Sequence, residues 1–185
     1  HLEANVSEPT ALTLSTSKTC LTCYCSTDGE ITITASGGLG GNASCVFEYS
    51  VDGINWQDSN VFTGLDAATY PVSVRDKNHI ACQAPAVDVI IGQPTELTFS
   101  SSITHATCGV GTDGQIVLTA SGGESGTYDY SLDGTIWQAS NTFSGLSALT
   151  YSVRIRDKAN PSCISAIEDI KIINFSPINY SNTFK

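Results

Sequence analysis

Short stretches in which apolar and polar residues alternate recur along the whole chain. In Glu30–Ala35 the apolar side chains Ile31, Ile33 and Ala35 alternate with polar neighbours, and this period of two is typical of a half-buried β-strand. The same alternation predicts further strands at Phe47–Val51, Tyr70–Val74, Tyr128–Leu132 and Tyr151–Ile155. No window supports a long amphipathic helix. The pattern therefore predicts an all-β protein.

Turn signals separate these predicted strands. Asp52-Gly53 and Asp133-Gly134 each lie between a strand and a Trp-containing segment, and Asp-Gly in such a place is a strong signal for a hairpin. Gly37-Gly38 and Gly122-Gly123 mark another turn. Several short strands with turns every 8–12 residues or so predict a small antiparallel β-sandwich.

A tandem repeat fills most of the chain. Thr27–Gly38 matches Thr112–Gly123 at nine of twelve positions with an offset of 85, and Tyr49–Leu65 recurs as Tyr130–Leu146 with an offset of 81. The change of offset places four extra residues in the first copy, between Gly38 and Tyr49. We therefore expect two domains, residues 8–92 and 93–175, with terminal extensions at 1–7 and 176–185.

One repeated detail narrows the class of sandwich. Leu65–Tyr70 and Leu146–Tyr151 each end in a tyrosine at the start of a predicted strand. This arrangement is typical of a tyrosine corner, in which the hydroxyl group bonds to the backbone at the turn between two sheets. We therefore predict two tandem immunoglobulin-like antiparallel β-sandwich domains.

Composition and charge exclude several classes of partner. The 185 residues carry eight basic and eighteen acidic side chains, a formal net charge of −10, which argues against binding a nucleic-acid backbone or an anionic membrane surface. No apolar run approaches the length of a membrane-spanning helix. The sequence has no methionine, so we expect a processed or excised piece of a longer product.

The order of the repeated motifs resembles a known family. Each copy has Cys-x-x-x-x-Asp-Gly, then Ala-Ser-Gly-Gly, Tyr-Ser-x-Asp-Gly, Phe-x-Gly-Leu, Thr-Tyr-x-Val-x-x-Arg-Asp and a final Cys. This order is similar to the SprB-type repeat of large surface adhesins of gliding Bacteroidota. The resemblance covers roughly Pro9 to Ile173. It implies an exported immunoglobulin-like module, secreted by the type IX route, in a long adhesive or fibrous surface protein.

In an exported protein the cysteines are expected to form disulfides. The repeat pairs Cys23 with Cys82 and Cys108 with Cys163. Three more cysteines have no counterpart in the second copy, and for them we favour a Cys25–Cys45 bond that leaves Cys20 free or intermolecular. A Cys20–Cys45 bond is the alternative, and a four-thiol zinc site of Cys20, Cys23, Cys25 and Cys45 is a third reading.

The sequence has few signs of catalytic or ligand chemistry. It lacks the serine-hydrolase elbow, the HExxH zinc motif and the phosphate loop, so we expect neither an enzyme nor a cofactor. His79 and His105 are read as surface loop residues. Asp-Gly pairs at 28, 52, 113 and 133 are read as hairpin turns rather than calcium ligands, although a calcium ion at the junction stays open; its candidate ligands are Asp76, Asp88 and Glu96.

The two tryptophans allow two interpretations. Trp56 and Trp137 recur in the same Trp-Gln context, which favours core indoles, whereas exposed indoles could stack on a sugar ring. The adjacent Arg-Asp pairs, Arg75-Asp76 and Arg156-Asp157, are read as ion-paired strand ends.

The favoured function is a structural one. We expect a segment of a bacterial surface fibre or adhesin, acting as a rigid stalk or in adhesion, whose partners are neighbouring repeats or subunits and surface glycans. The β-forming segment Ile172–Tyr180 could add a strand to a neighbouring subunit of a filament, or could simply be a last strand. The alternative function is a carbohydrate-binding module of a secreted polysaccharide-degrading enzyme.

Overall fold

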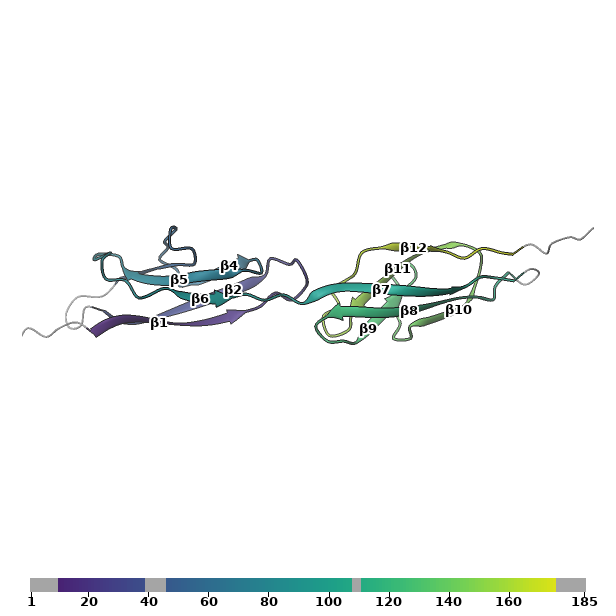
Figure 1. Cartoon of the computed structure of the whole chain (residues 1–185), viewed down its shortest axis with the longest axis horizontal. Helices are drawn as coiled ribbons and strands as arrows, with labels where there is room; N and C mark the ends of the chain where they lie inside the picture. The colour runs from purple at the N-terminus through teal and green to yellow at the C-terminus, as the bar shows by residue number, and fades with distance from the viewer. Residues whose placement is uncertain (1–9, 39–45, 108–110, 176–185) are drawn as a thin grey trace, which may run out of the picture. The chain divides into compact units, whose positions relative to one another are not determined.

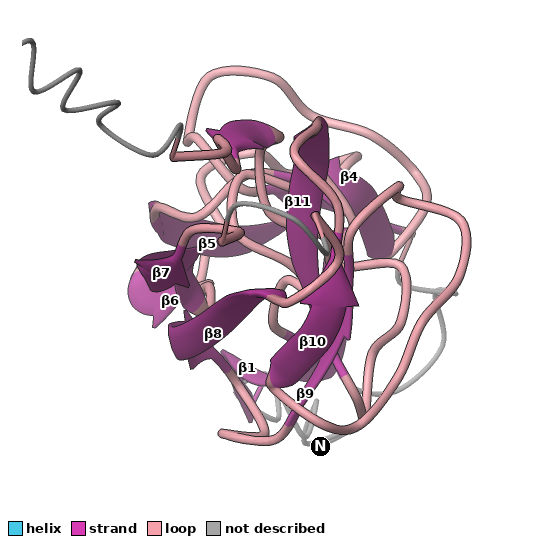
Figure 2. Ribbon diagram, turned by 90° about the vertical axis from the view of Figure 1, so that its right-hand side faces the viewer, coloured by secondary structure: helices cyan, strands magenta, loops and turns pink. Residues whose placement is uncertain are grey.

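The computed structural model describes residues 10–38, 46–107 and 111–175. The chain divides into two compact units, His1–Gln93 and Pro94–Lys185, called unit 1 and unit 2 below. In the described ranges the regular elements are strands, joined by turns and loops (Figure 2). The prediction of an all-β protein is confirmed.

Unit 1 consists of two three-stranded antiparallel sheets (Figure 1). One sheet has the order β1-β2-β4 and the other β3-β5-β6. The strands are β1 (Thr10–Thr19), β2 (Gly29–Gly38), β3 (Phe47–Ser50), β4 (Val61–Leu65), β5 (Thr69–Asp76) and β6 (Val87–Ile90).

Unit 2 repeats this topology strand for strand. Its sheets have the orders β7-β8-β10 and β9-β11-β12. The strands are β7 (Thr95–Thr104), β8 (Gly114–Gly123), β9 (Tyr128–Ser131), β10 (Thr142–Leu146), β11 (Thr150–Asp157) and β12 (Glu168–Lys171). All five strands predicted from the period of two are present. The pattern identified them because the apolar side chains of each strand point into the core between the sheets.

The core of unit 1 has a cluster near each end of the sandwich. Leu21, Ile31, Ile33, Val72, Val89 and Ile91 form one buried cluster. Leu12, Val74 and Ala84 form the other, with Phe47 and Ala35 packed against it. The first cluster lies at the end where the chain leaves the unit, because the Leu21 amide donates to the Gly92 carbonyl oxygen at 3.0 Å. The second lies at the end where β1 begins, since Thr10 pairs with Gly38.

The double glycines end a strand opposite a bulge. The register of β1 against β2 shifts between Thr10 and Thr13, and β7 shifts in the same way against β8. Gly37 and Gly122 have φ of +86° and +88°, and a Cβ on either would collide with a backbone oxygen, that of Ala11 or of Glu96. Only glycine fits such a place. The sequence predicted a turn at these glycines, whereas the structure places them in the last residues of β2 and β8, opposite a β-bulge.

A tyrosine corner closes each unit. The Tyr70 hydroxyl donates to the Asp66 carbonyl oxygen and the Tyr151 hydroxyl to the Ser147 carbonyl oxygen, both at 3.1 Å. Each bond spans four residues at the entrance to β5 or β11. This prediction is confirmed, and it fixes the crossing from one sheet to the other.

Candidate functional site

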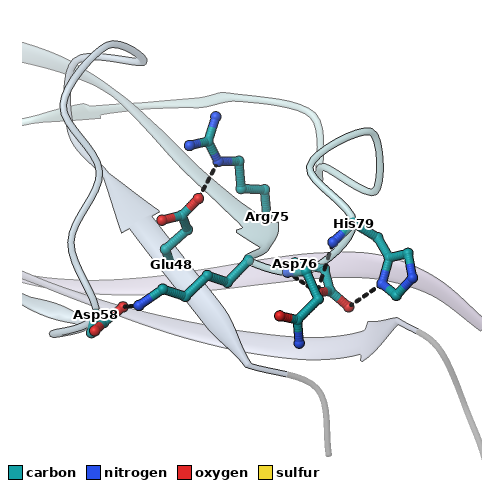
Figure 3. Close-up of polar contacts among 7 residues, drawn as sticks. Glu48, Asp58, Arg75, Asp76 and His79 are labelled. Atoms are coloured by element: carbon teal, nitrogen blue, oxygen red, sulfur yellow. Dashed lines mark hydrogen bonds and ion pairs between the residues drawn. The ribbon is translucent and has the colours of Figure 1, made fainter. Parts of the chain in front are cut away.

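A tryptophan, an arginine and a carboxylate form a stack on the β3–β5 face of unit 1. The Arg75 guanidinium carbon lies 3.9 Å from the centroid of a Trp56 ring. The Arg75 Nε atom also donates to Glu48 Oε1 at 2.6 Å, from the neighbouring strand (Figure 3). The arginine is held between an indole and a carboxylate, so its charge is neutralised and its side chain ordered.

Unit 2 carries the same stack. Arg156 lies 4.6 Å from the Trp137 ring centroid, and its Nε and Nη2 atoms donate to Asp129 Oδ2 at 3.1 and 2.9 Å. Both indoles are half-buried, and neither belongs to the buried core. The interpretation of core indoles is therefore wrong: the tryptophans lie at the surface, with one arginine against a ring of each.

The Asp-Gly loops that follow β3 and β9 are held by a carboxylate. Asp52 Oδ1 accepts from the backbone amides of Ile54 and Asn55 at 2.8 and 2.7 Å, and Asp133 Oδ1 accepts from those of Thr135 and Ile136. The side chain and the amide of Asn55 hold the pKa of Asp52 well below its usual range. The amides of Ile136 and Thr135 lower the pKa of Asp133 to about 2. These carboxylates are occupied by turn donors, as the turn reading predicts.

Asp28 and Asp113 have a different role from the predicted hairpin. Each precedes a strand, β2 or β8, and accepts the amide and hydroxyl protons of Thr22 or Thr107. The hydroxyl groups of Ser26 and Thr22 lower the pKa of Asp28 to about 2. The glycine that follows Asp28 is needed for space, because a Cβ there would lie 2.7 Å from the Leu65 carbonyl oxygen.

The aspartates after the two stacked arginines are buried. The prediction of ion-paired strand ends holds for the arginines, which pair across the sheet with Glu48 and Asp129. It does not describe the aspartates as surface groups, because Asp76 and Asp157 are 3% and 1% exposed. Asp157 accepts five hydrogen bonds from the loops on either side of it, from Glu124 N, Ser125 N, Ser125 Oγ, Ala159 N and Asn160 N.

The electrostatics of Asp157 follow from these contacts. Burial raises its pKa, but the amide and hydroxyl of Ser125 and the amide of Glu124 lower it more, and the result is a pKa well below the usual range. Asp76 accepts from the amides of Asn78 and His79, and His79 Nδ1 lies 3.7 Å from its Oδ2 (Figure 3). Both carboxylates hold the loop after the fifth strand of their unit.

The cysteines of unit 1 depart from the predicted pairing. Cys23 is disulfide-bonded, whereas Cys20, Cys25 and Cys82 are free thiols. The predicted Cys23–Cys82 and Cys25–Cys45 bonds are therefore wrong, and a zinc site that needs the Cys23 thiolate is excluded by its disulfide. Cys20 is free, one of the two states expected for it.

The fold explains why Cys23 and Cys82 do not meet. Cys23 lies in the β1–β2 connection beside Leu21, at the end where the chain leaves unit 1, and Cys82 follows β5 at the opposite end. The ten residues of β1 span about 30 Å at the rise of a β-strand, while a disulfide needs Cα atoms within about 7 Å. Equal spacing in the two copies showed which cysteines correspond but not at which end each lies.

In unit 2, Cys163 is disulfide-bonded. Cys45 and Cys108 lie outside the described residues, so the Cys108–Cys163 bond stays a prediction. Within the described ranges no group of three His, Cys, Asp or Glu side chains could hold a metal ion, and Asp88 and Glu96 are exposed. The search for long apolar helices among the same residues found none that could cross a membrane.

The repeated motifs can now be compared with known proteins. A family model described as SprB repeat matches residues 100–135. This segment is similar to the SprB repeat.

The SprB repeat match covers the second half of β7, all of β8 and β9, and the Asp133-Gly134 pair. It therefore includes the Ala-Ser-Gly-Gly segment opposite the bulge and the aspartate that holds the loop after β9. The corresponding segment of unit 1 is related to this SprB repeat by the internal sequence repeat and has the same sheet order. The resemblance noted from the motifs is thus confirmed for the second copy.

Solved structures with a similar fold are more distant. The three N-terminal domains of the highly immunogenic outer capsid protein (Hoc) of bacteriophage RB49 are 15% identical with a TM-score of 0.42, over 89% of this chain and 59% of that one. Fibronectin(III)-like modules of Clostridium thermocellum CbhA are 12% identical with a TM-score of 0.32, over 88% and 94%. A search of curated proteins found no match. The chain spans little more than half of the phage protein chain.

Two features of the repeated units could not be predicted from the sequence. The stacked Trp-Arg-carboxylate contacts join residues far apart in sequence, and only the register of β3 against β5, which pairs Glu48 with Arg75, brings them together. One feature of the sequence could have indicated that Asp157 is buried. It ends a predicted strand in which every second residue is apolar, and it falls on the same face as those apolar residues.

Proposed function

We propose that this chain is a non-catalytic segment of a bacterial cell-surface protein, exported by the type IX route, in which tandem immunoglobulin-like modules form a stalk that presents or mediates adhesion. The SprB repeat at residues 100–135 carries the proposal. The disulfide-bonded state of Cys23 and Cys163 supports an oxidising compartment, since disulfides are rare in reducing cytosol.

The fold suits a spacer module. Each unit has its own core and its own tyrosine corner, and only four residues, 91–94, separate β6 from β7. The net charge of −10 favours solubility on an exposed surface.

The test is surface exposure in the source bacterium. Antibodies raised against the chain should label intact cells, and external protease should remove the signal. Labelling that requires permeabilised cells would contradict export. Loss of surface signal in a strain without the type IX secretion machinery checks the route, and beads coated with the chain should adhere to cells or host surfaces above the level of beads coated with albumin.

A second candidate, glycan binding, is favoured by one observation. Trp56 and Trp137 are half-buried at the surface rather than in the core, where an indole can contact a sugar ring. If the chain is a carbohydrate-binding module, a glycan array should show binding that is lost in the double variant Trp56→Ala/Trp137→Ala. Binding that survives in the folded double variant, or no binding at all, removes this candidate.

A further inference from the structure

Three basic side chains form a row along the outer face of the β9-β11-β12 sheet in unit 2. Arg154 and Arg156 lie on β11. Lys158 follows the strand and continues its pairing, because the Lys158 amide donates to the Thr127 carbonyl oxygen at 2.9 Å. In Val153–Asp157 every second residue is buried, so the three basic side chains that alternate with them point away from the core. Arg154, Arg156 and Lys158 are called the basic row below.

The corresponding face of unit 1 has no unpaired positive charge. Arg75 pairs with Glu48, and Lys77 pairs with Asp58 (Figure 3). These two basic residues correspond to Arg156 and Lys158 of unit 2. Each of them has a carboxylate of its own, so the positive charges of this face are neutralised within the unit.

Two replacements between the copies change this balance. Ser73 of unit 1 corresponds to Arg154, and Asp58, the partner of Lys77, corresponds to Ala139. The first replacement adds a guanidinium, and the second removes the carboxylate that the lysine pairs with in unit 1. Each therefore raises the charge of the face by one, in a chain whose net charge is −10.

Only the middle member of the basic row has a partner. Arg156 pairs with Asp129 and lies against Trp137. Arg154 and Lys158 form no ion pair with any described residue, and the Arg154 Nε atom is buried without a hydrogen-bond partner among those residues. At the rise of a β-strand the two unpaired cations are about 13 Å apart along the chain.

This arrangement suits an extended polymer that carries carboxylates at intervals. One small anion cannot reach both cations, whereas guanidinium and ammonium groups each bind a carboxylate through charge-assisted hydrogen bonds. Trp137 lies on the same face, where an indole can contact a sugar ring. The negative charge of the rest of the chain opposes a polyanion, but at physiological ionic strength this repulsion is screened beyond about 8 Å.

We propose that the basic row of unit 2 binds a polyuronate, a polysaccharide of acidic sugars, and that Arg154 and Lys158 contact its carboxylates. This proposal rests on the proposed function of the chain as an adhesive surface segment, and it gives that adhesion a class of ligand. Exposed ion pairs are weak one by one, so adhesion through this face needs many copies of the chain on one polymer.

Binding of the whole chain to polygalacturonate, measured by biolayer interferometry, tests the proposal. Arg154→Ser, which introduces the residue of unit 1, should weaken binding about fivefold, and Arg154→Ser/Lys158→Ser at least tenfold. Ala139→Asp keeps both cations but gives Lys158 the carboxylate partner found in unit 1, and should also weaken binding. Dextran, which is neutral, and monomeric galacturonic acid, which cannot span the row, should not bind.

The matched control is Lys77→Ser. It removes one positive charge at the position in unit 1 that corresponds to Lys158, where the lysine already has a partner, so polygalacturonate binding should equal that of the native chain. Urea unfolding followed by tryptophan fluorescence shows whether unit 2 is folded in each variant.

Three results would overturn the proposal. A loss of binding in Lys77→Ser as large as in Lys158→Ser would assign binding to the overall charge of the chain. Equally tight binding of poly-L-glutamate would show that the sugar is not recognised. A native chain that does not bind polygalacturonate would remove this class of ligand. The surface-labelling experiment on intact cells does not depend on any of these results, so the two proposals can fail separately.

Discussion

The two units share their interior and differ at their ends. Both have the same sheet order, tyrosine corner, bulge glycines and Trp-Arg-carboxylate stack. Unit 1 alone has Cys20 and Cys25, where unit 2 has His105 and Val110. Its Cys25 also has a left-handed φ of 56° and donates its amide to Gln93 Oε1 at 3.0 Å.

The comparison distinguishes contacts that both units need in order to fold from cysteines that only one unit has or that differ in chemical state. Contacts that recur in both copies hold one sandwich together, because each copy needs them by itself. Among the described residues, the cysteines that differ in number or in state lie in the loops at the ends of a unit. Sequence change between copies is therefore concentrated where it leaves the core of the sandwich unaltered.

The largest expected effect comes from the buried aspartate. Asp157→Ala removes the acceptor of five part-buried hydrogen bonds, four of them from backbone amides, which should destabilise unit 2 by about 3 kcal/mol. Urea unfolding followed by fluorescence measures it, because each unit has one tryptophan and Trp56→Phe leaves only unit 2 visible. Asp76→Ala, in a Trp137→Phe background, is the matched variant for unit 1.

Each aspartate variant should leave the free energy of unfolding of the other unit unchanged. Equal destabilisation of both units by a single variant would contradict the independence of the two cores. If the urea midpoint of unit 2 is unchanged in Asp157→Ala, the carboxylate does not stabilise the unit. Other contacts would then hold the loops at 123–127 and 157–160.

Acidification is expected to have the next largest effect, with a defined sign. The folded-state pKa of Asp157 lies below its usual value, and those of Asp28 and Asp133 are about 2. A group whose pKa is depressed by folding stabilises the fold above its unfolded pKa of about 4, and this stability is lost as the pH falls through the folded pKa. Stability should be level from pH 7 to about 5 and decline towards pH 2.

The matched variant makes this a test of one group. In Asp157→Asn the decline in unit 2 should be smaller than in the native chain, while unit 1 keeps its own acid dependence. An identical acid curve for the variant and the native chain would show that Asp157 contributes nothing to it.

The tyrosine corners should show a smaller effect. Tyr151→Phe and Tyr70→Phe each delete one hydroxyl-to-carbonyl bond, worth about 1 kcal/mol. The bond of Tyr151 is part-buried and that of Tyr70 exposed, so the loss of unfolding free energy should be larger in unit 2. The same urea titrations measure both losses. A larger loss of unfolding free energy in Tyr70→Phe than in Tyr151→Phe would contradict this prediction.

Local features of this fold could be predicted from sequence, and features that depend on which end of the sandwich a residue occupies could not. Strand positions and the tyrosine corner follow from short-range patterns, such as Glu30–Ala35 and Leu65–Tyr70. The pairing of Cys23 could not be derived, because the repeat aligns cysteines without placing them in space. The indoles were misplaced because a recurring Trp-Gln context does not tell the inner face of a sandwich from its outer face.

The Trp-Arg stacks should show the smallest effect and the clearest spectroscopic one. Arg156→Lys keeps the positive charge but loses the guanidinium that contacts Trp137 and the two-donor pairing with Asp129, so unit 2 should lose about 0.5–1 kcal/mol. Arg75→Lys is the counterpart in unit 1, where the stack is closer, 3.9 Å against 4.6 Å, but the pairing with Glu48 uses one donor.

The emission of the remaining tryptophan distinguishes stacking from ion pairing in these variants. Losing the arginine from the ring face admits water and should shift the emission to longer wavelength, more for Trp56 than for Trp137, because the guanidinium of Arg75 lies closer to its ring. Glu48→Gln and Asp129→Asn remove the charge partner but leave the arginine present. If these two variants shift the emission as much as the lysine variants do, the carboxylate positions the arginine on the indole; if the emission stays unchanged, the contact with the ring holds the arginine by itself.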